Sequence, residues 1–170
     1  MNAQPVSALI QPCVVQVGGR PLVAAPCQAQ LERRHVRIHK DAEALFVKAE
    51  RSTVPVQHFA LHCRSFKDVG FNTKASLQAL YEKVAAEELQ FCTPELIIRL
   101  LELPQSALRL GKFCVVAMEP FPDEVGRPFI ALLSGVQKPD CPVSPMLRMI
   151  GSNPLTQWPP NTEVLFCKPL

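Results

Sequence analysis

The stretch TPELIIRLLEL, at residues 93–103, constrains the fold more than any other part of the chain. Thr93 can cap a helix with its hydroxyl, Pro94 suits the first helical position, and Glu95 faces the positive end of the helix dipole. The helix that follows is apolar on most sides and ends before Pro104. Because a helix that is apolar all round is normally part of a core, the sequence predicts a buried helix here.

A second helix is expected just before the buried one, with Asn72 or Thr73 as its cap. Its apolar residues follow the i, i+3, i+4, i+7 spacing of one helix face: Leu77, Leu80, Tyr81, Val84 and Ala85. A final turn at residues 106–110 is followed by Gly111, and glycine commonly ends helices. The sequence therefore predicts a helical centre at about residues 73–110.

Beyond residue 112 the apolar pattern changes from helical to strand-like. Four β-prone runs are separated by short loops such as PFPDEVGR: KFCVVAME, PFIALLS, MLRMI and EVLFCK. The loops are short enough for successive strands to pair antiparallel. We therefore expect a C-terminal β meander at about residues 112–168.

The N-terminal part of the chain is expected to begin as a flexible arm, because residues 1–11 show no apolar period. Two apolar runs then follow, at residues 13–17 and 22–25. They flank Gly18 and Gly19, which can adopt the positive φ that tight turns need. This pattern predicts a β-hairpin.

The segment at residues 41–51 leaves two structures open: a short helix capped by Asp41, or a strand that starts at Leu45. The order of strands, two helices and more strands is typical of an α+β domain. We therefore predict a single α+β domain at residues 12–170, in which antiparallel sheet packs on a central two-helix segment.

Composition limits the function classes. The chain has 170 residues, of which 48% are hydrophobic and 19% are charged, so a folded globule is expected rather than a disordered chain. The net charge of +3 is too mild to force a general affinity for nucleic acid. The start of the chain has no basic leader before an apolar stretch, and no run of about 18 apolar residues occurs. These features predict a soluble cytoplasmic protein that has no membrane contact.

The cysteines give one candidate for catalysis. All seven are spread singly and form no C-x-x-C pair, which favours reduced thiols over a disulfide framework. Cys92 stands directly before the predicted cap Thr93, where the helix dipole can lower a thiol pKa. A cysteine enzyme would also need a base, and no histidine lies nearby in the sequence. The alternative for Cys92 is a half-buried residue at a helix junction.

All four histidines lie in two short stretches, HVRIH at residues 35–39 and HFALH at residues 58–62. On a helix, this spacing would let two histidines bind one ion. Both stretches alternate, however, which predicts strands and puts the two histidines of a stretch about 13 Å apart at roughly 3.3 Å per residue. Pairing His35 with His62 and His39 with His58 would still supply too few ligands, because no acid or thiol lies on that face. We therefore predict no metal site and no other cofactor.

The same stretches raise a second possibility, a surface that binds anions. Basic side chains are expected on the strand faces: Arg33, His35, Arg37 and His39 in the first stretch, and His58, His62 and Arg64 in the second. Clustered arginine and histidine suit phosphate or carboxylate, so a nucleic acid partner is possible. Sheet-based RNA readers stack bases on exposed aromatics, and this face has none. The alternative is the solvated outer face of a half-buried sheet.

Trp158, in a proline-rich loop, either plugs the end of the core or anchors a protein interface. Glycine-rich phosphate loops and the common hydrolase motifs do not occur. The leading hypothesis is therefore a non-catalytic interaction or assembly module that binds a protein partner or itself. An anion or nucleic-acid binder that uses the Arg/His strands comes second, and a cysteine enzyme built on Cys92 comes third.

Overall fold

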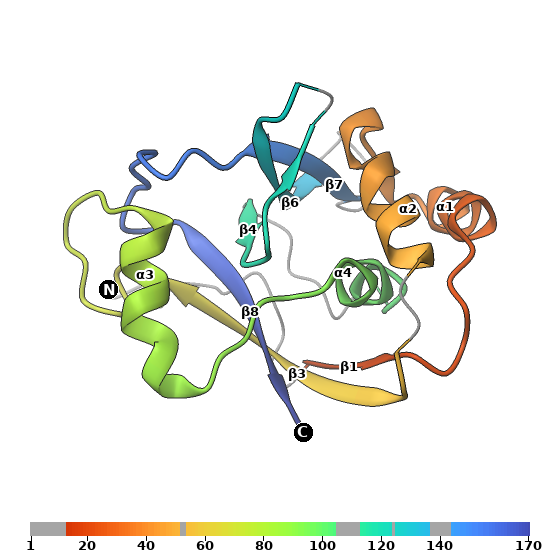
Figure 1. Cartoon of the computed structure of the whole chain (residues 1–170), viewed down its shortest axis with the longest axis horizontal. Helices are drawn as coiled ribbons and strands as arrows, with labels where there is room; N and C mark the ends of the chain where they lie inside the picture. The colour runs from red at the N-terminus through yellow and green to blue at the C-terminus, as the bar shows by residue number, and fades with distance from the viewer. Residues whose placement is uncertain (1–12, 52–53, 105–112, 124, 137–143) are drawn as a thin grey trace.

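The computed structural model describes residues 13–51, 54–104, 113–123, 125–136 and 144–170 (Figure 1). The helices are α1 (Ala24–Arg33), η1 (Lys40–Ala42), α2 (Glu43–Glu50), α3 (Leu77–Val84), η2 (Ala85–Glu87) and α4 (Pro94–Leu101), where η marks a 3-10 helix. The strands are β1 (Cys13–Val17), β2 (Arg37–Ile38), β3 (Gln57–Ser65), β4 (Cys114–Val116), β5 (Phe121–Pro122), β6 (Pro128–Val136), β7 (Ser144–Gly151) and β8 (Glu163–Pro169).

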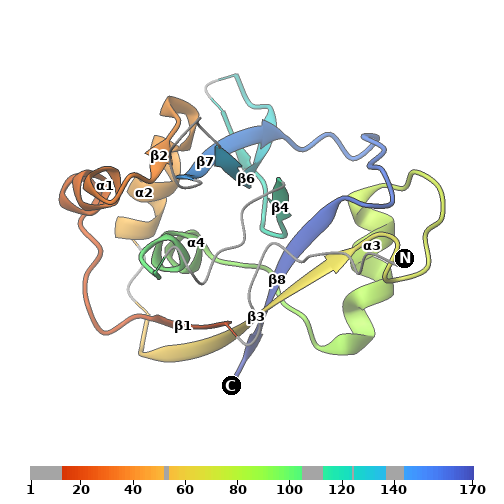
Figure 2. The ribbon, with the colours of Figure 1, turned by 180° about the vertical axis from the view of Figure 1, so that it is seen from behind.

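The strands form one mixed sheet in the order β1-β3-β8-β4-β6-β7-β2, and β5 pairs with β6. The pairs β4–β8 and β2–β7 are parallel, and the other pairs are antiparallel. The sheet curves around α4, while α2 and α1 close its open side (Figures 1 and 2). The helix α3 lies outside the curve, against β8 (Figure 1). The prediction of sheet packed with helices is confirmed, but the sheet is mixed rather than purely antiparallel.

Helix α4 confirms the strongest local prediction. The Thr93 side chain accepts a hydrogen bond from the Leu96 backbone N–H at 3.3 Å, and Pro94 occupies the first turn. Almost every side chain of the helix is buried, including the carboxylate of Glu95. One oxygen of Glu95 accepts a hydrogen bond from the Gly18 backbone N–H at 3.0 Å. This bond joins the start of α4 to the end of β1.

Helix α3 begins later than predicted. Ser76, rather than Asn72 or Thr73, caps it by accepting a hydrogen bond from the Ala79 backbone N–H. The preceding residue, Ala75, instead forms a two-way backbone bridge with Trp158, and this bridge holds the chain extended. The bridge is a non-local interaction, so a local cap signal could not show it.

The predicted N-terminal hairpin is wrong in its second half. Gly18 and Gly19 do adopt positive φ, of 81° and 76°, but they lead into α1 and not into a strand. The i, i+4 pair Cys27 and Leu31 gives α1 a buried face, and this face outweighs the short apolar run at residues 22–25. Strand β1 pairs with β3 instead.

The segment at residues 41–51 is helical, as the first of its two predicted alternatives required. The residue that caps η1 is His39, not Asp41, because the His39 ring accepts a hydrogen bond from the Asp41 backbone N–H. The Asp41 carboxylate turns toward the sheet and accepts a hydrogen bond from the Met149 backbone N–H at 3.0 Å. This contact fixes η1 against β7.

The four C-terminal runs are strands, and β4, β6 and β7 pair antiparallel in the predicted order, but the fourth run does not continue this meander. Strand β8 does not lie beside β7; it lies between β3 and β4 and runs parallel to β4. Its residues from Glu163 to Cys167 are buried on both faces, as expected of a central strand. The predicted arm at residues 1–11 and the predicted turn at residues 106–110 lie outside the described residues.

Candidate functional site

The two histidine stretches do not face each other. Strand β3 carries His58 and His62, whereas β2 lies at the far end of the sheet, beyond β8, β4, β6 and β7. His35 is not in a strand at all: it has a φ of 62°, in the left-handed region. The pairing of His35 with His62 and His39 with His58, considered as one possibility, does not occur, and the seven basic residues form two separate groups. The cause is that β3 finds its partners in β1 and β8.

The β3 group lies on the outer face of the sheet, as the alternation predicted, while Cys63 points inward. Arg64 pairs with Glu87 at 2.8 Å, and Lys168 of the neighbouring strand pairs with Glu88 at 2.8 Å. Burial, together with the charges of Arg64 and Lys168, lowers the pKa of His62. An anion at this face would compete with two carboxylates for the same cations.

The second basic group lies near β2. Arg33 is exposed in the last turn of α1, and His35 and Arg37 are exposed after it. His39 is exposed as well, with Nδ1 2.9 Å from a carboxylate oxygen of Asp41. Its role as the cap of η1 gives this histidine a structural reason to be present. Binding of an anion by this group stays a prediction.

Cys92 is buried rather than poised at a surface. Its thiol donates a hydrogen bond to the Leu165 carbonyl at 3.8 Å. A hydrogen bond with the Cys167 thiol and complete burial raise the pKa of Cys92 well above its usual range. This shift is opposite to the lowering that the helix dipole was expected to cause. A protonated, buried thiol is a poor nucleophile.

Burial of Cys92 predicts slow alkylation. In the folded protein at neutral pH, we expect iodoacetamide to modify Cys92 at least about 100-fold more slowly than in the urea-unfolded chain, because modification requires local opening. Peptide mass spectrometry after timed quenching measures the rate at this residue alone. Native modification as fast as that of the unfolded chain would show that Cys92 is an accessible thiol after all.

An open groove of about 560 Å³ lies between the η1–α2 segment and the β5–β6 hairpin. Phe121 and Phe129 are cross-strand partners on its floor, and both are half-buried. Charged or exposed residues surround this floor: Lys40, Asp41, Glu43, Asp123, Val125 and Arg127. The groove therefore combines an apolar centre with a rim that carries charges of both signs.

Cations cover both aromatic rings of the groove. The Lys48 ammonium lies 5.0 Å from the centre of the Phe121 ring, and the Arg127 guanidinium lies 5.7 Å from the centre of the Phe129 ring. At these distances a cation is attracted to the ring face. Each ring thus has a cation contact that favours its present orientation.

The turn beside the groove is held by Asp123. Its carboxylate accepts hydrogen bonds from the backbone N–H groups of Val125 and Arg127, and it forms an ion pair with the Arg127 guanidinium at 2.7 Å. Burial alone would raise the pKa of Asp123, but the hydrogen bonds and the charge of Arg127 together outweigh it, so the pKa is lowered. The turn holds the side chain of Val125 73% exposed at the mouth of the groove.

Trp158 does not line the groove. It is half-buried and packs against the core, and its backbone bridges Ala75. This placement gives the tryptophan a packing role just before the start of α3. Its predicted alternative role as an interface anchor stays a prediction.

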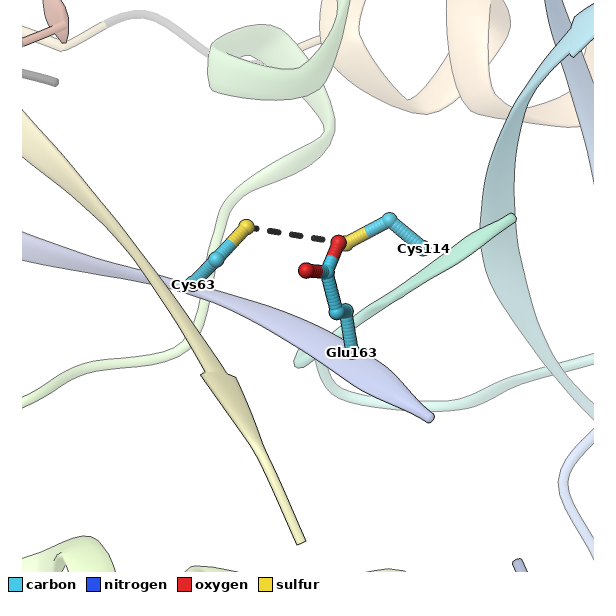
Figure 3. A group of neighbouring side chains, drawn as sticks. All are labelled: Cys63, Cys114 and Glu163. Carbon is cyan, nitrogen blue, oxygen red and sulfur yellow. Dashed lines mark hydrogen bonds between the residues drawn. The ribbon is translucent and has the colours of Figure 1, made fainter. Parts of the chain in front are cut away.

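The structure also brings together three buried side chains that the sequence did not single out. Cys63 of β3, Cys114 of β4 and Glu163 of β8 point to one place on the inner face of the sheet (Figure 3). The two sulfur atoms are 3.9 Å apart. The alternation in HFALHC does place Cys63 inward, but nothing local to the sequence shows which strands lie beside β3.

No protein-family model matches the chain, and no curated protein or solved structure is significantly similar to it. Within the described part of the chain, every helix is too short or too polar to cross a bilayer.

Proposed function

We propose that the chain is a non-catalytic interaction module that holds a protein partner, or a second copy of itself, in the groove between η1–α2 and β5–β6. The observation that supports this proposal is the composition of the groove: two aromatic rings, each in contact with a cation, and charges of both signs around them. Protein interfaces commonly combine a buried apolar centre with a polar rim.

The shape of the groove favours a peptide segment over a small metabolite. Ligand sites for small molecules bury most of the ligand, whereas this groove is partly open to solvent. Aromatic side chains are common at the centres of protein interfaces, and Phe121 and Phe129 supply two of them. Val125 adds an exposed apolar side chain at the edge, where a partner would cover it.

The competing hypotheses have weaker support. The basic residues lie in two groups, and the carboxylates of Glu87 and Glu88 already pair with cations of the first group. The thiol of Cys92 is buried with a raised pKa, which does not suit a nucleophile. A reducing compartment such as the cytoplasm fits the proposal, because it would keep the scattered cysteines as thiols.

Site-specific photo-crosslinking tests the proposal. With a benzophenone amino acid in place of Val125, irradiation of expressing cells is expected to give a discrete adduct, to another protein or to a second copy of the chain. The additional change Phe121→Ala is expected to weaken that adduct by about tenfold or more, as loss of an interface anchor does. Immunoblotting measures the yield, and mass spectrometry identifies the partner.

The matched control is Leu155, which is 81% exposed and lies outside the groove. The same photoreactive residue at position 155 is expected to give no discrete adduct. Equal adducts at both positions, or an adduct at position 125 that Phe121→Ala leaves unchanged, would mean that the groove is not the binding surface.

A further inference from the structure

The inner face of the sheet carries a second feature, independent of the groove: the convergence of Cys63, Cys114 and Glu163 (Figure 3). These residues come from β3, β4 and β8, which are neighbours in the order β3-β8-β4. Cys114 and Glu163 are direct register partners across the parallel pair. Cys63 pairs with Leu165, and Glu163 lies two residues before Leu165 on the same face. Three regular strands therefore fix all three side chains on one side of the sheet.

The spacing of the two sulfur atoms fits a shared ion. A disulfide would bring them to about 2.05 Å, but they lie 3.9 Å apart. Two thiolates on one tetrahedral zinc, each at about 2.3 Å, have their sulfur atoms about 3.8 Å apart. A thiol–thiol hydrogen bond would also allow this distance. A carboxylate oxygen of Glu163 also lies within 4.8 Å of both sulfur atoms and supplies a third potential ligand.

The three side chains could together compensate the charge of a bound cation. All three side chains are buried, with Cys63 9%, Cys114 2% and Glu163 8% exposed. If all three lost their protons, they would bring three negative charges together away from water, and this is unfavourable without compensation. A divalent cation at the centre would balance these negative charges, as the thiol protons do when no ion is bound. Binding would release these protons to solvent.

The ligand types select the ion. Thiolates are soft ligands and exclude magnesium and calcium, which prefer oxygen. Zinc accepts cysteine sulfur and glutamate oxygen together in tetrahedral geometry, and three protein ligands plus a water is a common zinc arrangement. We propose that Cys63, Cys114 and Glu163 bind one zinc ion that links β3, β8 and β4 on the inner face of the sheet. This site stands whether or not the groove binds a partner.

The test uses the full chain, stripped of metal with a chelator and then titrated with Co²⁺ as a coloured substitute for zinc. We expect binding of one equivalent, with the intense visible bands of tetrahedral cobalt and a sulfur-to-cobalt charge-transfer band. Zinc should displace the cobalt. The variants Cys63→Ser, Cys114→Ser and Glu163→Gln should each weaken Zn²⁺ binding at least about 100-fold, because even the loss of a residue that only supports a ligand weakens binding about 10- to 100-fold.

Cys27→Ser is the matched control. Cys27 is also buried, but it lies on α1 and donates a hydrogen bond to Glu102 at 3.6 Å. This variant also removes one buried thiol and should keep the affinity and the charge-transfer band of the wild type. Circular dichroism checks that each variant folds.

X-ray absorption of the zinc-loaded wild type needs no variant. It is expected to show two sulfur ligands at about 2.3 Å with oxygen completing the shell. Absence of stoichiometric binding would overturn the proposal. So would a shell without sulfur, or a binding loss in Cys27→Ser that Cys63→Ser and Cys114→Ser do not share.

Discussion

Replacement of Arg99 by leucine is expected to lower the free energy of unfolding by about 3 kcal/mol. The guanidinium lies 3.5 Å from a carboxylate oxygen of Glu95, whose side chain is only 3% exposed. Without Arg99, that carboxylate would stay buried beside the Gly18 N–H, which donates a hydrogen bond to it but carries no full charge. Urea denaturation followed by circular dichroism gives the change in unfolding free energy, which should appear as a lower midpoint with an unchanged slope.

A double variant separates the buried charge from the other contacts of Arg99. This arginine also pairs with Glu102 at 3.0 Å and donates to the Arg20 carbonyl. Glu95→Gln removes the charge and keeps an oxygen that can accept from Gly18. Arg99→Leu with Glu95→Gln should therefore recover part of the loss, because an uncharged buried pair is better tolerated than a lone charge. If the double variant is no more stable than Arg99→Leu alone, the lost contacts to Glu102 and Arg20 account for the effect.

Replacement of Gly18 by alanine is expected to lower the free energy of unfolding by about 2–5 kcal/mol. Gly18 has a φ of 81°, which strains any residue with a Cβ atom. A Cβ here would also lie only 2.4 Å from the Pro55 carbonyl oxygen, a backbone atom that cannot rotate away. The turn after β1 would have to move. This movement would also displace the backbone N–H at position 18, which donates a hydrogen bond to Glu95. Thermal unfolding of the purified variant measures the loss.

Gly126→Ala is the control that measures the strain of a positive φ without a close contact. Gly126 has nearly the same φ, 80°, but nothing lies within 4 Å of the place where its Cβ would be. We expect this variant to lose only about 1–2 kcal/mol. Equal losses at the two positions would show that the close approach of Pro55 adds nothing to the effect.

Helix α4 could be predicted because every signal for it is local. Thr93, Pro94 and the apolar run that follows lie within one short stretch and point to the same structure. The turn at Gly18 shows the limit of this approach: its positive φ was predictable, but the path of the chain after it was not. Whether residues 22–25 continue as strand or enter a helix depends on the buried face of α1, and this face forms against elements that follow later in the chain, such as α2.

The order of the sheet could not be predicted for a related reason. A strand pattern shows which side chains face inward, and that part of the prediction for β3 is correct. It does not show which strands become neighbours, because backbone hydrogen bonds are the same for every partner. The groove and the thiol cluster both depend on such neighbours. Cys63 meets Cys114 only because β8 places Glu163 between their two strands.

The position of β8 has a consequence for the newly made chain. It is the last described strand in the sequence, yet it joins β3 on one side to β4 on the other. During synthesis, the facing edges of β3 and β4 therefore leave the ribosome before their common partner exists. Unpaired strand edges readily pair with other chains, and long-range strand pairing is slow. Until residues 163–169 are made, the facing edges of β3 and β4 therefore lack their native partner and can pair with other chains.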